Sequence, residues 1–145
     1  MNERDPYNLH RFLAAQAEDY ECALAELKQG RKESHWIWYI FPQVAGLGQS
    51  AMSQEYAIRS GNEAAAYLDH PILGARLQKC CEALLKQEGK RVQEIMGFPD
   101  DLKLRSSMTL FAKISNPDSV FQKVLNAFYP GQMDERTVAF LEARK

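Results

Sequence analysis

The fold class depends on one stretch of the chain, residues 35–41, which reads HWIWYIF. A continuous apolar run of this length is compatible with a buried strand or a short buried helix, because it has no periodicity that separates the two. We find no second strand-like stretch to pair with it, and an unpaired buried strand would leave its backbone amides and carbonyls without hydrogen bonds. We therefore favour a short helix that ends at Pro42, with the strand as the open alternative.

Towards the N-terminus, residues 9–27 carry apolar side chains at intervals of three and four, which is the spacing of one helical face. Asp5 and Pro6 suit the start of such a helix, because Asp caps free amides and Pro fits the first helical position. Gly30 stands where a left-handed residue would end the helix. The sequence predicts one long amphipathic helix between residues 5 and 30.

Towards the C-terminus, the same pattern returns in shorter pieces. Ser60, with Glu63 three residues later, has the spacing of a capping box, and Asp134 is placed to cap a final helix. Apolar stripes separated by Gly and Pro predict further helices between these points. We expect an all-α fold, a single compact domain over residues 1–145 with seven or eight helices and short loops.

Composition limits the classes of function. Apolar residues make up 46% of the chain and charged residues 26%, which is typical of a globular domain. The formal net charge is -1 with both signs interspersed, so we expect neither a nucleic-acid partner nor a membrane partner. Three cysteines do not form an even disulfide framework, and the charged first residues are not followed by an apolar run. These features predict a cytoplasmic protein.

Polar residues on apolar stripes are the first candidates for a functional site, because an unpaired buried polar group costs about 1–3 kcal/mol. Gln16 lies on the apolar stripe of the first helix. Its side chain either contacts a ligand or is a core amide that forms a hydrogen bond with a loop carbonyl. Ser107 lies on the stripe between Leu104 and Phe111, as a ligand contact or bonded back to its own helix. Lys103 flanks that face, with its ammonium group in water or on a ligand.

The aromatic run and its flank supply further candidates. His35 is either an acid or base, or a packed residue with one satisfied nitrogen. Trp36 and Trp38 are expected in the core, with the alternative that one of them lines a pocket. Arg31 is either a solvated cation or a contact for an anionic ligand with a flat ring. We expect no metal site and no cofactor, because the histidines and cysteines lie on distant elements.

The string SHWIWYIFPQ at residues 34–43, followed by GLG at 46–48, closely resembles a bacterial family called domain of unknown function 1810. The resemblance continues through HP at 70–71, DLK at 101–103 and SSMTLF at 106–111, so it covers nearly the whole chain. It implies a mainly α-helical single domain. Members are sometimes labelled calpastatin, after an inhibitor that is disordered in isolation, whereas the patterning here suits a packed domain. The motif brings no activity for its polar positions, which are Ser34, His35, Gln43, Asp101, Lys103, Ser106 and Ser107.

Two functions follow as hypotheses. In the first, the SHWIW segment and the DLKLRSS segment meet and line a pocket for a small anionic or nucleotide-like ligand, with His35 or Asp101 as the acid or base of any reaction. In the second, an exposed part of the aromatic segment docks a partner protein without catalysis. The sequence does not decide between an enzyme and a binding protein. The ligand-binding candidates are Arg31, Ser34, His35, Trp36, Trp38, Gln43, Lys103, Ser106, Ser107 and Gln16.

Overall fold

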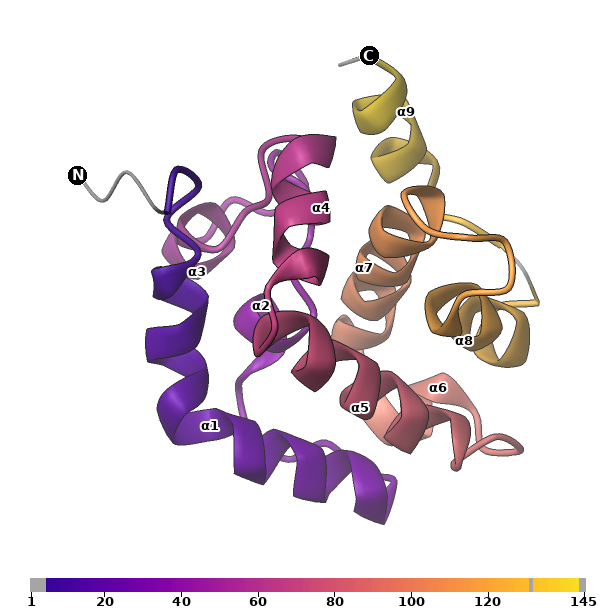
Figure 1. The fold of residues 1–145 in the computed structure, drawn as a ribbon. Coiled ribbons are helices and arrows are strands. Elements are labelled where there is room, and N and C mark those ends of the chain that lie inside the picture. Colours follow the sequence, from indigo (N-terminus) through magenta and orange to yellow (C-terminus); the bar gives the residue numbers. More distant parts are fainter. Residues whose placement is uncertain (1–4, 131, 144–145) are drawn as a thin grey trace.

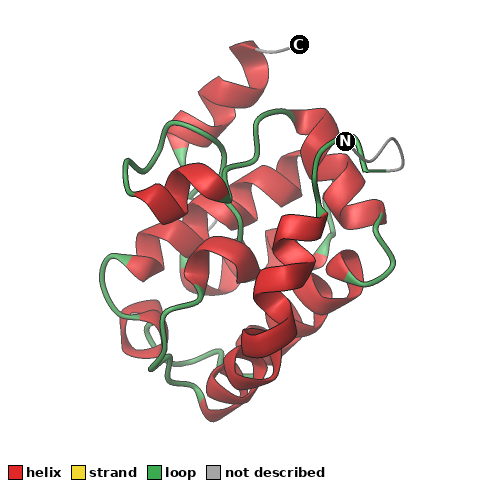
Figure 2. Ribbon diagram, turned by 90° about the vertical axis from the view of Figure 1, so that its left-hand side faces the viewer, coloured by secondary structure: helices red, strands yellow, loops and turns green. Residues whose placement is uncertain are grey.

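The polypeptide forms helices joined by loops, and its computed structural model describes residues 5–130 and 132–143 (Figures 1 and 2). No strand is present in these ranges, which confirms the all-α prediction, although nine helices appear where seven or eight were expected. Three of the nine, α2, α3 and α6, have only four or five residues. The helices are α1 (His10–Gln29), α2 (Ile37–Ile40), α3 (Ala51–Glu55), α4 (Gly61–Asp69), α5 (Leu73–Leu85), α6 (Val92–Met96), α7 (Asp100–Lys113), α8 (Val120–Phe128) and α9 (Glu135–Ala143).

The first helix begins later than the Asp5–Pro6 pattern predicts. Asn8 has a left-handed φ of 53°, which a right-handed helix cannot include, so residues 6–9 form a turn and α1 starts at His10. Asp5 still caps this end, because its carboxylate accepts hydrogen bonds from the amides of Leu9 and His10 at 2.7 and 2.9 Å. Gly30 ends α1 with a φ of 79°, as the sequence predicts.

The aromatic run that decides the fold class forms one helical turn, α2, and not a strand. Helical hydrogen bonds form within the turn, since the amides of Ile40 and Phe41 donate to the carbonyls of Trp36 and Ile37. Four of these side chains are at most 2% exposed, and Tyr39 is 5% exposed. The run is therefore buried as a short helix between α1 and α7.

Two central helices organise the rest of the fold. Helix α5 packs against α1, α4 and α8, and α7 packs against α8, α9, α4, α6 and α2 (Figure 1). Aromatic rings connect α1, α4, α7 and α8 through the core, with centroid distances of 5.1 Å from Phe12 to Tyr67, 5.6 Å from Tyr67 to Phe111 and 5.5 Å from Phe111 to Phe121. Such ring pairs add to the apolar burial that stabilises the fold.

The corner between α4 and α5 is tightly packed. The hydroxyl of Ser60 accepts from the Glu63 amide at 3.0 Å, so the predicted cap starts α4. At the other end, Nδ1 of His70 accepts from the amides at the start of α5. A methyl group on Gly74 would lie 2.2 Å from the carbonyl oxygen of Leu68. Only glycine therefore allows the two helices to approach this closely.

Candidate functional site

Glu26 holds the loop that precedes α2. Its carboxylate is buried, with the residue 7% exposed. One oxygen accepts from the amides of Glu33 and Ser34 at 2.8 and 3.0 Å and from the Trp36 indole at 2.9 Å. The other accepts from the Ser34 hydroxyl at 2.6 Å and from the thiol of Cys22 at 3.1 Å. The segment before α2 is therefore attached to the last turns of α1 by four donors that share one carboxylate, and the fifth donor, Cys22, lies in α1 itself.

This arrangement requires an ionised carboxyl. Burial by itself would raise the pKa of Glu26, but the hydrogen bonds from Ser34, the Glu33 amide and the Trp36 indole outweigh it and lower the pKa to about 2. Hydrogen bonds to a charged acceptor are stronger than neutral ones. Glu26 thus fixes the course of the chain into the aromatic segment.

Lys32 joins the same loop to α7. Its ammonium group lies 2.8 Å from Oδ2 of Asp100, and the Lys32 side chain is only 5% exposed. The group also donates to the carbonyl of Ser34 and lies 4.7 Å from the ring centroid of Trp36. Because these contacts occupy Lys32, its charge is neutralised within the protein.

Lys103 on α7 is less restrained. Its ammonium group lies 3.8 Å from the other Asp100 oxygen and 5.5 Å from the ring centroid of Trp38, and its side chain is 28% exposed. Trp38 is half-buried, and its indole nitrogen is buried without a hydrogen-bond partner among the described residues. Ser107, one turn further along α7, is fully buried with an unpartnered hydroxyl. We call the group Trp38, Asp100, Lys103 and Ser107 the Trp38–Lys103 surface.

The structure thus brings the two predicted segments together, but several predicted residues have structural contacts instead. Gln16 donates to the Tyr39 carbonyl at 2.7 Å and to the Tyr67 hydroxyl at 3.0 Å, which is the core-amide alternative. Ser106 donates to the carbonyl of Leu102 in its own helix. The hydroxyl of Ser34 and the indole of Trp36 are bonded to Glu26.

The remaining candidates lie around the surface or away from it. Arg31 and His35 are exposed, and their side chains have no hydrogen bond or ion pair within the described parts of the chain. Gln43 is half-buried, and its backbone carbonyl accepts from the amide of Ile58. Asp101 is 4% exposed, and its carbonyl accepts from the hydroxyl of Tyr129 on the side of α8. Asp101 is two residues, or about 200°, from Lys103 around α7, so it faces a different direction.

The cavities that we describe lie elsewhere. Five of them have volumes of about 380 to 520 Å³, and none is lined by Trp38, Lys103 or Ser107. The Trp38–Lys103 surface is therefore part of the outer face of the protein, with two unpartnered polar atoms buried behind it. Within the described ranges, no three His, Cys, Asp or Glu side chains are grouped as a metal ion would require.

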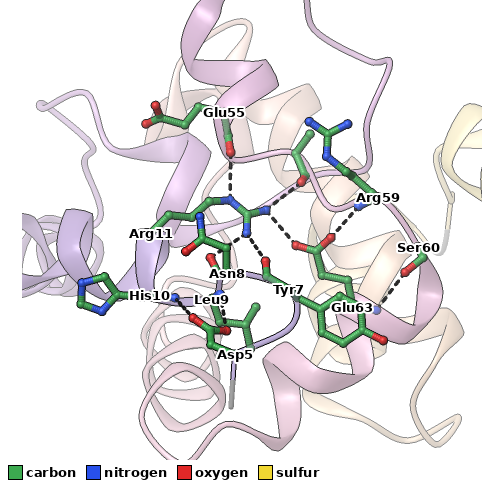
Figure 3. A network of polar contacts seen from close by, with 11 residues as sticks. Asp5, Tyr7, Asn8, Leu9, His10, Arg11, Glu55, Arg59, Ser60 and Glu63 are labelled. Atoms are coloured by element: carbon green, nitrogen blue, oxygen red, sulfur yellow. Dashed lines mark hydrogen bonds and ion pairs between the residues drawn. The ribbon is translucent and has the colours of Figure 1, made fainter. Parts of the chain in front are cut away.

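One polar network was not anticipated from the sequence (Figure 3). The guanidinium group of Arg11 donates to four backbone carbonyls and lies 2.8 Å from the carboxylate of Glu63, with side chains 15% and 4% exposed. The same carboxylate accepts from the amide of Arg59. The network joins three parts of the chain: α1, the segment that follows α3, and α4. Because all three guanidinium nitrogens donate to protein acceptors, Arg11 has no donor left for a ligand.

These features define a class of protein: an all-α domain whose aromatic segment is buried against two helices and held by an internal carboxylate. The chain belongs to the DUF1810 family, described as a protein of unknown function, whose model matches residues 6–141. It is similar to the conserved hypothetical protein Rv1873 from Mycobacterium tuberculosis. That crystal structure has a TM-score of 0.93 and 47% sequence identity, over 95% of this chain and 99% of the other. No curated protein matches the chain.

Among the described residues, no helix has both the length and the apolar character needed to cross a membrane.

Proposed function

We propose that the protein binds a small anionic ligand at the Trp38–Lys103 surface. The observation that carries the proposal is the partly exposed ammonium group of Lys103, 5.5 Å from the ring centroid of Trp38, whose indole nitrogen is a buried hydrogen-bond donor without a partner among the described residues. An unpaired buried donor costs about 1–3 kcal/mol, and an oxyanion that accepts from it, once the half-buried Trp38 ring turns to expose the nitrogen, would remove that cost. A charged acceptor would also interact favourably with Lys103.

The local charges favour Lys103 over Lys32 as the ligand contact. Lys32 is almost fully buried and lies 2.8 Å from Asp100, whereas Lys103 has only the longer contact of 3.8 Å with that carboxylate. The carboxylate of Asp100 thus contacts two ammonium groups. Lys103, the more exposed of the two lysines, therefore has N–H donors free for a ligand. Arg31 and His35 are exposed on the loop before α2 and would contact a larger ligand.

The test uses calorimetry to measure the binding of inorganic phosphate, sugar phosphates and nucleotides to the wild-type protein and to two variants. Lys103→Gln removes the ammonium group and is expected to weaken binding at least about tenfold, or about 1.4 kcal/mol. Lys113→Gln removes an exposed ammonium group at the end of the same helix and should leave the affinity unchanged. Equal affinities for all three proteins, or no binding by the wild type, would refute the proposal.

The alternative function, a docking module formed by the aromatic segment, stays a prediction. Trp36 is 1% exposed and bonded to Glu26, so Trp36→Ala would damage the fold and cannot test docking. Trp38 is the half-buried member of the segment and is the position to substitute. We also propose a cytoplasmic location, which three free thiols support, because disulfides are rare in reducing compartments.

A further inference from the structure

Arg105 on α7 has a guanidinium group without a protein partner. The residue is half-buried, and its Nε atom is buried without a hydrogen-bond acceptor. Within the described parts of the chain, its side chain forms no hydrogen bond and no ion pair. A buried donor that lacks an acceptor costs about 1–3 kcal/mol, and a charged donor costs more. An acceptor supplied by a ligand would therefore be bound favourably at Arg105.

An acidic residue one turn earlier in α7 does not neutralise this cation. Asp101 precedes Arg105 by four residues, which is a spacing at which opposite charges pair on a helix. No ion pair joins the two side chains, and Oδ1 of Asp101 is itself buried without a hydrogen-bond partner among the residues that the structure describes. The guanidinium group of Arg105 thus keeps its charge and its donors for a contact outside α7.

Arg105 lines a cavity of about 500 Å³ at the start of α9. This volume suits a small molecule, because ligand pockets measure about 300 to 1,000 Å³. The other walls come from the segment before α9 and from its first residues, which are Gln132, Met133, Asp134, Glu135 and Arg136. The amide of Asp134 donates to the Thr109 hydroxyl at 2.9 Å, so this segment is fixed to α7. The cavity is therefore bounded by two parts of the fold that are bonded to each other.

The charges around the cavity favour a carboxylate over a multiply charged anion. Arg136 supplies a second guanidinium group, and only one of its nitrogens is used within the described residues, in a bond of 3.2 Å to the Gly46 carbonyl. Asp134 and Glu135 bring two negative charges, which cancel the two positive ones. With no net charge in the lining, the second charge of a phosphate would gain little attraction and would still lose its hydration.

We propose that this cavity binds a small carboxylate ligand whose carboxylate group accepts hydrogen bonds from Arg105 and Arg136. A planar guanidinium group matches a carboxylate with two parallel hydrogen bonds. Met133 is half-buried and offers a flexible apolar contact for the rest of the ligand. Simple carboxylic acids and amino acids share this chemistry. Glu135 is exposed and has no partner in the described ranges, so it would favour the ammonium group of an amino acid.

The experiment uses calorimetry with three probes of similar shape: 4-methylpentanoate, its amide 4-methylpentanamide, and L-leucine. The wild type is expected to bind 4-methylpentanoate at least about tenfold more tightly than the amide, which has no charge. Arg105→Gln and Arg136→Gln should each weaken the binding of 4-methylpentanoate at least about tenfold. Arg59→Gln is the matched control, because it removes an exposed guanidinium group before α4 and should change no affinity. Tighter binding of L-leucine than of 4-methylpentanoate would identify the ligand as an amino acid, and the reverse order a simple acid.

Thermal unfolding of the same variants separates binding from a structural role. Because the guanidinium group of Arg105 has no partner among the described residues, Arg105→Gln should lower the midpoint temperature no more than Arg59→Gln does. The probe 4-methylpentanoate should raise the midpoint of the wild type and not that of Arg105→Gln. A larger loss of stability in Arg105→Gln without ligand would show that Arg105 is a structural residue, and would overturn the inference.

These outcomes are independent of the proposed function. Lys103 does not line the cavity and lies about 200° from Arg105 around α7, so Lys103→Gln should bind 4-methylpentanoate as the wild type does. The inference fails if the wild type does not bind the acid, if acid and amide bind equally, or if Lys103→Gln weakens binding and Arg105→Gln does not. The proposed function is decided separately, by phosphate-bearing anions and Lys103.

Discussion

Replacing Glu26 with Gln should destabilise the protein in a pH-dependent way. The substitution keeps the size of the side chain but removes the charge that accepts from Ser34, Glu33 and Trp36. Lowering the pKa from 4.5 to about 2 corresponds to about 3 kcal/mol, at 1.36 kcal/mol per pKa unit. This value is an upper limit, because Ser34 and Cys22 border solvent and screening reduces the effect.

The sign of the pH dependence follows from the direction of the shift. Because the pKa of Glu26 is lower in the folded protein than its ordinary value of 4.5, the stabilisation is complete above that value. It is lost as the pH falls from 4.5 towards 2, where the carboxyl becomes protonated in both states. The wild type should therefore exceed Glu26→Gln by up to about 3 kcal/mol at neutral pH, and the difference should shrink below pH 4.5.

Urea unfolding followed by tryptophan fluorescence, at several pH values between neutral and 3, measures this difference. Glu33→Gln is the matched control, since Glu33 lies in the same loop but its side chain is exposed. Its free energy of unfolding should stay close to that of the wild type. A difference between wild type and Glu26→Gln that does not change with pH would refute the role assigned to the ionised carboxyl, as would an equal effect of Glu33→Gln.

Three further predictions concern the core. Gly74→Ala places a methyl group against a carbonyl of α4 and should lower the free energy of unfolding by about 1–3 kcal/mol. In the control Gly61→Ala, the atom nearest to the added methyl group is 3.7 Å away, so the free energy of unfolding should change by less than about 1 kcal/mol. Thermal unfolding of both variants measures the two effects. Gln16→Leu leaves a buried carbonyl and a buried hydroxyl without their donor, so a loss of about 1–3 kcal/mol is expected, and a neutral result in urea titration would be inconsistent with this account. At neutral pH a thiol reagent should modify Cys22, which is exposed, and not Cys80, whose pKa burial raises to about 12; mass spectrometry of the native protein would detect the opposite result.

Local features of the fold could be predicted because they depend on neighbouring residues. The cap at Ser60, the left-handed stop at Gly30 and the cap at Asp134 are all present as expected. The first helix was predicted to begin too early, because asparagine adopts the left-handed conformation more readily than most residues but is also common in right-handed backbone, so its presence at position 8 does not by itself mark a turn. Aspartate at a cap and proline after it are compatible with a turn as well as with a helix.

The site was only partly predictable because its contacts join distant parts of the chain. The helical spacing of Gln16 correctly placed it in the core, but spacing cannot identify Tyr39 and Tyr67 as its partners. Glu26 was missed, although it lies three residues after buried Ala23 and so borders the apolar face of α1. An acidic residue at such a position is a signal that could have been followed.

The pairing of Arg11 with Glu63, 52 residues later, was also missed. The docking of the helices determines which of the many charged residues form ion pairs. That docking is determined by the packing of the whole core, and it cannot be inferred from a single sequence at these separations.

The most direct test of the proposed function is nuclear magnetic resonance of the indole N–H group of Trp38 during a titration with inorganic phosphate. Assignment by Trp38→Phe separates its signal from that of Trp36, which is bonded to Glu26 and should not move. The account predicts a saturable shift of the Trp38 signal in the wild type that Lys103→Gln weakens at least about tenfold. A Trp38 signal that does not respond, or that responds equally in Lys103→Gln, would contradict it.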